Sequence, residues 1–395
     1  MSKLNILIES NNEGIIEASE LLKLGKLVAF PTETVYGLGA NALNEKAVLS
    51  IFEAKGRPLT DPLIVHVTDK ESAKELIEFD VNTIGMDEEK IVFDALSDNF
   101  WPGPLTIIAL ASSIIPKLVT AGTGYVGVRV PSHPLALSLL SECKLPIAAP
   151  SANRFGHVSP TRAQHVIDDL GNKGVRVLNG DNHKSCDLGI ESTVAKISGI
   201  DKCVHIFRQG GITKQQIQKV IDSLEIGWKL DVVAKVVNMK HNDTNENHSI
   251  ETNIGQEAPG QAVTHYAPDI PTHIISSYEF NNNNVHANKK IITAAELAAV
   301  VIIDFGGKMK ALEKKCLAYR DLSSSSSANE GANKLFETLR WAESCPGASQ
   351  VFLSSINNHN NSDKYTKPTD DLTDGLADRI FRAGSGVYLD ILVSL

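Results

Sequence analysis

The chain has 395 residues, of which 42% are hydrophobic and 22% are charged, so it is long enough for two domains with ordinary cores. Its formal net charge of -9 excludes a global basic field that would draw it onto nucleic acid, although a local basic cleft is compatible with that total. No segment approaches the run of about 18 apolar residues that a membrane-spanning helix needs.

The cysteines argue for a reducing compartment. The chain has five, at Cys143, Cys186, Cys203, Cys316 and Cys345, and no two form a CxxC pair. An odd number at these spacings is unlike a disulfide framework or a cysteine-built zinc site. The first residues, MSKLNILIESNNEG, carry acidic side chains and lack the apolar core of a signal peptide. We therefore expect a soluble, cytoplasmic protein that does not contact a membrane.

Apolar spacing in the first half predicts helices alternating with strands. The predicted helices are residues 15–24, 44–53, 135–143 and 163–170, and the predicted strands are residues 26–30 and the segments PLIVHV, LTIIAL and VGVRVP. Gly25 is typical of a helix C-cap, and Asn44 of an N-cap. Strands mixed with helices through Pro/Gly-rich turns indicate an α/β layered domain up to about Val220.

The second half begins with a change of composition. Residues 241–260 are polar, Asn-rich and without periodicity, which is typical of a linker. The later segments THIISSY, AAVVIIDF, ANKLFETLRWAES and ASQVFLSS predict a smaller α/β unit. The Asn- and Ser-rich runs 281–284, 323–327 and 357–363 are predicted surface loops.

Two glycine patterns invite a dinucleotide-binding interpretation, which we weigh and set aside. GLGANA (Gly37–Ala42) fits G-x-G-x-x-A, and GTGYVG (Gly122–Gly127) fits G-x-G-x-x-G. Such glycines need a helix N-terminus directly behind them to receive the pyrophosphate. GTGYVG runs into a strand-like stretch instead, and PTETVY stands before GLGANA where the tight turn should be. The chain also has no GxxxxGK[ST] motif, so a P-loop is excluded.

Several cationic side chains lie in apolar segments, where burying a charge without a partner costs free energy. Arg129 lies inside the apolar segment VGVRVP, and Arg208 follows VHIF. A guanidinium within an apolar strand needs a partner or a ligand, and arginine binds phosphate or carboxylate bidentately. Taken alone, Lys55 and Arg57 of KGRP are as typical of a solvated helix end as of an anion-binding site. His66 within PLIVHV is as typical of a satisfied core histidine as of a ligand contact. The group predicts one anion-binding site.

Polar side chains also follow two further strands. PIAAPSANRFGHVSPT places Ser151, Asn153 and Ser159 after an apolar strand, and LGIESTV interrupts a strand-like stretch with Glu191 and neighbouring hydroxyls. Turn chemistry accounts for some of these residues, but their density favours a polar ligand. No serine nucleophile is indicated, because no G-x-S-x-G elbow is present. HKSC at residues 183–186 is a weak metal signal.

These motifs together resemble a known family. FPTETVYGLGANA, KGRP with PLIVHV, WPGPLT, VGVRVPSHPLAL, PIAAPSAN with SPT, GIESTV and FRQGGIT occur in this order. They resemble the YrdC-like catalytic domain of threonylcarbamoyl-AMP synthases over about residues 10–215. APGQAVTHYAP and GLADRIFRAG resemble, more loosely, the linker end and C-terminal domain of the two-domain form. There QAVT stands where the family form is MKYK, so a lysine and a tyrosine are replaced.

The resemblance implies a fold and an activity. It implies a YrdC-like twisted mixed sheet with helices over residues 10–220, a linker or lid at 221–268, and a smaller Rossmann-like α/β domain at 269–395. The family makes L-threonylcarbamoyladenylate and pyrophosphate from L-threonine, bicarbonate and ATP. That product serves threonylcarbamoyl-transferase machinery, which modifies the tRNA adenosine beside the anticodon. Mg²⁺ is expected with ATP, and no protein-bound metal is expected.

The resemblance also implies site residues, carried over motif by motif. Those expected around threonine are Thr34, His66, Arg129, Ala149 and Ser192. Those expected around the nucleotide are Lys55, Arg57, Asp61, Tyr125, Ser151, Asn153, Ser159, Arg208, His265 and Tyr266. Lys55, Arg57 and Arg129 are the expected catalytic cations. Asp61 stands where many members carry Asn, and a carboxylate there repels phosphate.

Two alternatives stay open from sequence. Hydrogenase-maturation carbamoyltransferases contain a similar domain, but they resemble a longer chain with CxxC zinc fingers and an acylphosphatase-like segment, which this chain lacks. A non-catalytic protein that binds double-stranded RNA on a concave basic surface is the other. The net charge of -9 leaves room only for weak RNA binding.

Overall fold

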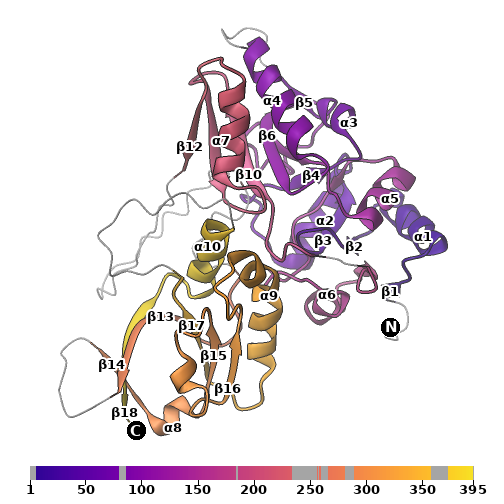
Figure 1. Ribbon diagram of the computed structural model, residues 1–395. Helices are drawn as coiled ribbons and strands as arrows, with labels where there is room; N and C mark the ends of the chain where they lie inside the picture. The colour runs from indigo at the N-terminus through magenta and orange to yellow at the C-terminus, as the bar shows by residue number, and fades with distance from the viewer. Residues whose placement is uncertain are drawn as a thin grey trace, which may run out of the picture.

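The protein folds into two α/β domains, each with its own sheet (Figure 1). This computed structural model describes residues 6–79, 86–183, 186–233, 256, 258, 266–280, 289–356 and 372–394. Among them, no helix combines the length and apolarity needed to cross a bilayer. The Asn-rich runs 281–284 and 357–363 fall almost wholly outside these residues, as does most of the predicted linker.

The first domain is built on a twisted mixed sheet with helices packed against it. The strand order is β1-β9-β2-β3-β8-β4-β7-β6-β10-β11-β12, with β5 paired to β6. In that order the strands are Leu7–Ile8, Arg176–Leu178, Val28–Phe30, Gly37–Asn41, Ile147–Ala148, Ile64–His66, Tyr125–Arg129, Leu105–Ala111, Thr193–Ser198, Cys203–Arg208 and Lys229–Val232, with β5 at Ile77–Glu78. The sheet is mixed because β4 and β7 are parallel whereas β2 and β3, and β6 and β7, are antiparallel. Strand β12 carries this sheet to Val232, past the predicted boundary near residue 220.

The helices of the first domain are α1 Asn12–Lys23, α2 Glu45–Lys55, α3 Lys70–Lys74, α4 Met86–Phe100, α5 Pro134–Cys143, α6 Ala163–Leu170 and α7 Lys214–Ser223. Four of them, α1, α2, α5 and α6, match predicted stretches, whereas α3, α4 and α7 were not predicted. The Asn44 side chain accepts hydrogen bonds from the first backbone amides of α2, as an N-cap does. At the other end Gly56 takes a left-handed backbone (φ 66°), which turns the chain sharply between Lys55 and Arg57.

The second domain has a wholly parallel sheet of order β14-β18-β13-β17-β15-β16. Its strands are β13 Thr272–Phe280, β14 Lys290–Thr293, β15 Val300–Asp304, β16 Ala318–Asp321, β17 Gln350–Ser354 and β18 Tyr388–Ser394, and its helices are α8 Ala294–Leu297, the 3₁₀ turn Lys310–Leu312, α9 Ala328–Ser344 and α10 Thr373–Ala383. The predicted smaller α/β unit is thereby confirmed. In the predicted Ser-rich surface loop, Ser323 is an exception: it is buried and donates to Glu330 at 2.6 Å.

Both glycine patterns lie in or before strands. Gly37–Asn41 is strand β3, antiparallel to β2, and GTGYVG leads into β7. Neither is a strand-to-helix turn, so the dinucleotide interpretation fails. The glycines of β3 allow close packing instead: a Cβ on Gly39 would lie 2.8 Å from the Phe30 ring, and one on Gly37 would lie 3.2 Å from the Ala149 methyl.

One apolar cluster joins the two domains. Val35, Val158 and Ile190 of the first domain pack with residues of the second that include Phe336 of α9 and Leu376 of α10. Figure 1 shows α9 and α10 on the side of the second domain that meets the first. Apolar burial of this kind is typical of an interface that holds two domains together.

Candidate active site

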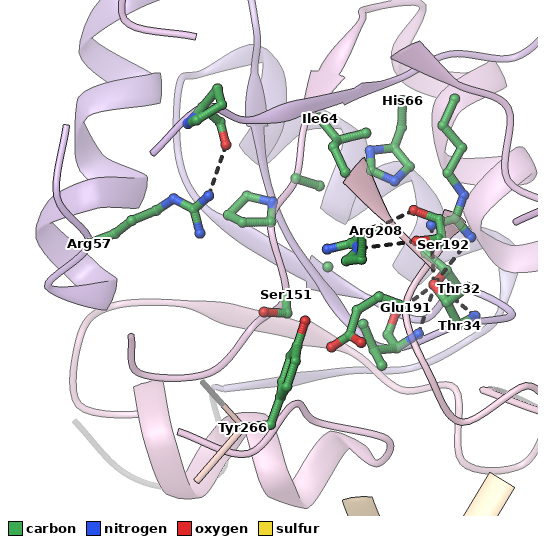
Figure 2. A pocket seen from close by; sticks show the side chains of 16 residues that line it. Thr32, Thr34, Arg57, Ile64, His66, Ser151, Glu191, Ser192, Arg208 and Tyr266 are labelled. Atoms are coloured by element: carbon green, nitrogen blue, oxygen red, sulfur yellow. Dashed lines mark hydrogen bonds between the residues drawn. The ribbon is translucent and has the colours of Figure 1, made fainter. Parts of the chain in front are cut away.

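A cavity lies where loops after β2 and β8 meet β4, β7 and β11 (Figure 2). Its wall combines three buried guanidinium groups, several hydroxyls and one carboxylate. The lining residues are Thr32, Thr34, Val35, Gly37, Arg57, Pro62, Ile64, His66, Arg129, Ala149, Pro150, Ser151, Glu191, Ser192, Arg208 and Tyr266. The motifs from which an anion site was predicted thus converge on one place.

The loop after β2 forms a polar shelf. Thr32 donates to the backbone carbonyl of Val35 at 2.6 Å, and the hydroxyls of Thr32 and Thr34 lie 2.8 Å apart. These bonds close a tight turn before β3, which explains the hydroxyls at the end of a buried strand. Thr34 is only 1% exposed, and the contact with Thr32 holds its hydroxyl in place.

Arg129, the last residue of β7, is fixed against this shelf. Its Nη1 and Nη2 both donate to the Thr34 hydroxyl at 3.1 Å, and Nη2 also donates to Glu33 at 2.6 Å. Its Nε donates to the Gly103 carbonyl at 3.3 Å. The buried charge predicted from VGVRVP is thus neutralised by Glu33, and the guanidinium plane has a defined orientation.

His66 of β4 lies beside Arg129 in the cavity wall. Its side chain is buried, and within the described part of the chain its Nδ1 has no hydrogen-bond partner. Burial, together with the Arg129 charge, lowers the pKa of His66 to about 3. The ring is therefore neutral at physiological pH and offers a nitrogen to a ligand, since a buried polar atom without a partner is costly.

Arg208 closes the same side of the cavity from the end of β11. Its Nη2 donates to the Ser192 hydroxyl and its Nε to the Ser192 carbonyl, both at 3.0 Å. The Ser192 hydroxyl is also 2.9 Å from that of Thr106. Burial lowers the pKa of Arg208, although a guanidinium stays charged at any physiological pH.

Arg57 stands on the opposite side in Figure 2. Its Nη2 pairs with Asp61 at 2.9 Å and donates to the Pro62 carbonyl at 2.8 Å. Asp61 itself is not part of the wall; it lies behind Arg57 and balances its charge. The left-handed Gly56 is what turns Arg57 toward the cavity while Lys55 points back under it.

Several residues predicted around the nucleotide support the wall from behind. Lys55 donates to the carbonyls of Ser151 and Asn153 at 2.5 Å each, so it braces the turn that carries Ser151. The Asn153 amide donates to backbone carbonyls of its own loop. Ser159 donates to Glu191 at 2.6 Å. Tyr125 lies outside the lining, under the ammonium group of a lysine on β10.

Glu191 is the one charged wall residue that was not among the predicted site residues. It supplies the only carboxylate among the lining residues, and it is 5% exposed. Burial alone raises its pKa, but Arg379 and Arg208 outweigh that effect and hold the pKa below its ordinary value. A carboxylate inside a strand-like GIESTV was a visible signal, because an acidic residue in a buried strand requires a cationic partner.

The linker end contributes one described residue to the cavity. Tyr266 is buried, lines the wall and packs its ring against Phe336 of α9 at 5.3 Å between centroids. Burial raises the pKa of its phenol. His265, its predicted companion, lies outside the described residues.

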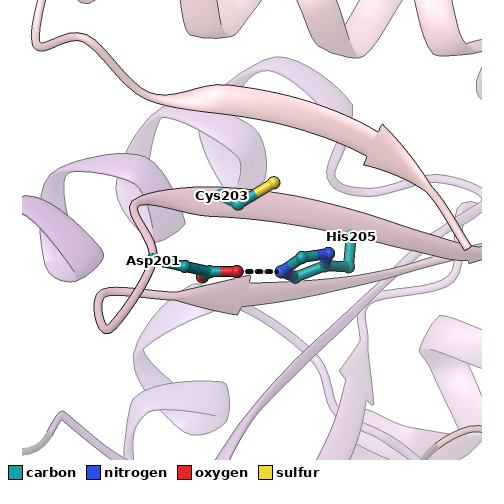
Figure 3. A group of neighbouring side chains, drawn as sticks. All are labelled: Asp201, Cys203 and His205. Carbon is teal, nitrogen blue, oxygen red and sulfur yellow. Dashed lines mark hydrogen bonds and ion pairs between the residues drawn. The ribbon is translucent and has the colours of Figure 1, made fainter.

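Two groups outside the cavity bring metal-ligating atoms within 4.8 Å of one another. They are Asp201, Cys203 and His205 on the β10–β11 hairpin (Figure 3) and His157, Asp269 and Glu343 at the domain junction. In the first, His205 pairs with Asp201 at 2.8 Å, and in the second His157 pairs with Glu343 at 3.1 Å. Both groups thus have internal partners. HKSC offers no test, because two of its four residues are outside the described part.

Comparison with known proteins identifies the family of the chain. A family model described as "Telomere recombination" matches residues 20–210, and one described as "Threonylcarbamoyl-AMP synthase, C-terminal domain" matches residues 212–385. The chain is 39% identical over 311 residues to the threonylcarbamoyl-AMP synthase of Bacillus subtilis, covering 75% of this chain and 79% of that protein. It is 40% identical over 251 residues to the Pyrococcus abyssi protein of the same name, covering 64% of each.

A solved structure matches the whole fold. The crystal structure of P. abyssi Sua5 complexed with L-threonine superposes with a TM-score of 0.73 at 29% identity and covers 98% of each chain. Agreement over both domains means that their order and architecture are shared.

Proposed function

We propose, since the chain belongs to the threonylcarbamoyl-AMP synthase family, that it forms L-threonylcarbamoyladenylate and pyrophosphate from L-threonine, bicarbonate and ATP. The observation that carries this proposal is the convergence of Arg57, Arg129 and Arg208 on one cavity. Its wall also presents hydroxyl groups and an imidazole, which a small hydroxy amino acid could contact. We further propose that the product serves tRNA modification through a separate transferase.

We assign the Thr34 side of the cavity to threonine. Arg129 can receive the substrate carboxylate, because its guanidinium is already oriented and partly compensated. The neutral His66 ring offers a nitrogen to the substrate amine or hydroxyl. Ala149 and Ser192 complete this side with a methyl group and a hydroxyl. A small amino acid with one hydroxyl suits such a surface.

We assign the Arg57 side to the nucleotide. Arg57 and Arg208 can bind phosphate oxygens, and Ser151 can donate to them. In this assignment Lys55, Asn153 and Ser159 act by holding the wall, and Asp61 acts through Arg57. Tyr266, from the linker end, covers the nucleotide. His265 is assigned to the nucleotide by its motif alone. Tyr125 lies outside the cavity lining, so it is assigned to the nucleotide by its motif alone.

The reaction then needs placement and charge compensation rather than a protein nucleophile. The threonine nitrogen attacks the carbon of bicarbonate, and water leaves to give a carbamate. A carbamate oxygen attacks the α-phosphorus of ATP, the bond to the β-phosphate oxygen breaks, and pyrophosphate leaves. Well-aligned reactants can gain roughly 7–11 kcal/mol from proximity. The guanidinium groups offset the negative charge that gathers around phosphorus.

Magnesium fits this site as a companion of ATP rather than as a resident ion. The one carboxylate in the wall, Glu191, has both oxygens engaged, by Ser159 and Arg379. Mg²⁺ usually takes few protein ligands and several phosphate oxygens and waters. Bound to ATP, it would neutralise the β- and γ-phosphate charges.

The cavity must widen to take both substrates. The space in it that is open to a water-sized sphere is about 50 Å³, whereas pockets that hold drug-sized ligands have about 300–1,000 Å³. Tyr266 is the wall residue contributed by the linker end, so we propose that it moves outward when ATP enters.

The direct test is pyrophosphate release. We expect release that requires ATP, threonine and bicarbonate together and that stops when any one is omitted. Release without threonine, or the same rate with valine in its place, would contradict the assignment. A gel shift with double-stranded RNA over a salt series serves as the counter-test for the RNA-binding alternative.

A further inference from the structure

Buried between the domains, Arg379 of α10 reaches from the second domain into the wall of the first. Its side chain is fully buried, and its Nε donates to Glu191 Oε2 at 3.0 Å. Its Nη1 donates to the backbone carbonyl of Gln209, next to Arg208. The Arg379 guanidinium also lies 5.7 Å from the centroid of the Tyr266 ring. One arginine therefore touches three segments that line the cavity.

Glu191 links Arg379 to the cavity wall. Its other oxygen, Oε1, accepts the Ser159 hydroxyl at 2.6 Å. With one oxygen bound from each domain, the carboxylate has a fixed orientation between Ser159 and Arg208. Both of its cationic neighbours, Arg379 first and Arg208 second, favour the ionised form and keep its pKa low. Without Arg379, the effect of desolvation on the pKa of Glu191 would be offset less. The pKa would then rise, and the carboxyl would take up a proton more easily.

The backbone around this contact is shaped for close approach. A Cβ on Gly375, one turn before Arg379, would lie 3.0 Å from the Ile190 side chain and 3.6 Å from the Gly210 carbonyl. Gly210 is itself enclosed, because a Cβ there would lie 2.3 Å from the Glu191 carbonyl. Helix α10 therefore packs directly against the segment before β10, which contains Glu191, and against the segment that follows Arg208 at the end of β11.

Stability alone does not account for the Arg379–Glu191 pair. Desolvating two charges offsets much of their attraction, so apolar residues of similar volume often stabilise a protein equally well. The apolar cluster around Phe336 and Leu376 already joins the domains. The pair does have a direct consequence for the cavity, since it sets the charge and orientation of its only carboxylate.

We propose that Arg379 is a positioning residue of the active site: the second domain completes the cavity by holding Glu191 ionised and oriented toward Ser159 and Arg208. This proposal rests on the proposed function and deepens it, because it gives the C-terminal domain a part in the reaction. The side affected is the one assigned to the nucleotide. The two domains therefore have to be docked for the enzyme to turn over.

The test compares Arg379→Met, Arg379→Lys and Arg162→Met in the full-length chain. Arg162 pairs with Glu337 of α9 at 2.7 Å, so its variant breaks another contact between the domains, one that is exposed and does not involve Glu191. We expect Arg379→Met to lose about 30-fold or more in kcat/KM for ATP, as when one partner of a buried charge pair is truncated. We expect Arg379→Lys to lose less and Arg162→Met to match the unchanged protein.

The pH profile separates positioning from mere structural support. Between about pH 5.5 and 8.5 the unchanged protein should show no acid limb from Glu191, because its pKa is low. Arg379→Met should acquire one, with activity recovering in part as pH rises, since the carboxyl keeps Ser159 and Arg208 but loses its largest cationic influence, which raises its pKa. Adding Glu191→Gln to Arg379→Met should abolish that limb. A loss equal at every pH, or activity within twofold of Arg162→Met, would overturn the proposal.

Binding measurements keep this test independent of turnover. Calorimetry with a non-hydrolysable ATP analogue should show about tenfold weaker binding to Arg379→Met than to Arg162→Met, with thermal unfolding checked for both. If the unchanged protein failed to release pyrophosphate, the proposed function would fall while this binding difference would still support the positioning role. Equal binding by the two variants would count against Arg379 whatever the turnover.

Discussion

The two sides of the cavity are held in different ways. On the Thr34 side, Arg129 of β7 bonds to Thr34 and Glu33 of the loop after β2, some 95 residues away along the chain. On the other side, the contacts of Arg57 within the described part of the chain go to its own turn, to Asp61 and Pro62. The cation assigned to threonine is thus held by tertiary contacts before any ligand binds, whereas Arg57 is held by a local loop. We infer that the amino-acid side is preorganised and that Arg57 is the part of the nucleotide side that adjusts.

The largest effect should come from the preorganised side. Arg129→Met removes the cationic partner of Glu33 and a donor to Thr34, together with the charge that we assign to the threonine carboxylate. We expect kcat/KM for threonine to fall about 100-fold or more, the range for truncating a buried hydrogen-bonded ion pair. Arg176→Met, which breaks a partly exposed pair with Glu17, is the matched control and should change little.

A second variant tests the locally held side. Arg57→Met should raise KM for ATP about 30-fold while the KM for threonine changes by less than about threefold. Steady-state pyrophosphate release against each substrate in turn measures the difference. If Arg57→Met weakened threonine and ATP equally, the two sides would not be separate and the comparison would collapse.

A smaller effect is expected from a single hydroxyl on the shelf. Thr34→Val keeps the shape but removes an acceptor of two Arg129 hydrogen bonds. The loss of about 1–1.5 kcal/mol that one such group is worth corresponds to roughly tenfold in kcat/KM for threonine. The protein should unfold at nearly the same temperature. Unchanged turnover with threonine would remove Thr34 from the site.

A further prediction concerns the effect of His66 on stability rather than on turnover. The pKa of His66 is lowered to about 3 by burial and Arg129, against about 6.5 in the unfolded chain. The unfolded state therefore binds a proton that the folded state does not, and stability falls as pH drops from about 6.5 toward 3. His66→Phe should lose less stability than the unchanged protein over that interval, as urea unfolding at several pH values would show. Parallel curves would mean that His66 titrates normally.

Local structure was predictable where a few neighbouring residues determine it. Asn44 caps α2, and Ala47, Val48, Ile51 and Phe52 form its buried face, all from periodicity and capping chemistry. The two domains followed from the change of composition near residue 241. The end of the first sheet at Val232 was missed because β12 is a short edge strand whose residues are half exposed, so it carries little apolar signal.

The site was predictable in its charges but not in its contacts. Arg129 was conspicuous as a guanidinium in an apolar strand, and the cavity contains it. The position of Lys55 was not foreseeable, because a lysine at a helix end is usually solvated. In the structure it is buried under the Ser151 turn. Arg379 was equally hidden, because its partner Glu191 is 188 residues away along the chain. Pairings of that kind depend on how the domains dock, which a local pattern does not encode.

The central claim is that one cavity joins an amino acid, a one-carbon unit and a nucleotide. Mass spectrometry of the adenylate formed from ATP, threonine and ¹³C-labelled bicarbonate tests it most directly. The account predicts a threonylcarbamoyl-adenylate that carries the heavy carbon, formed by the unchanged protein and nearly absent with Arg129→Met. An adenylate without the label, or equal labelled product from Arg129→Met, would contradict it.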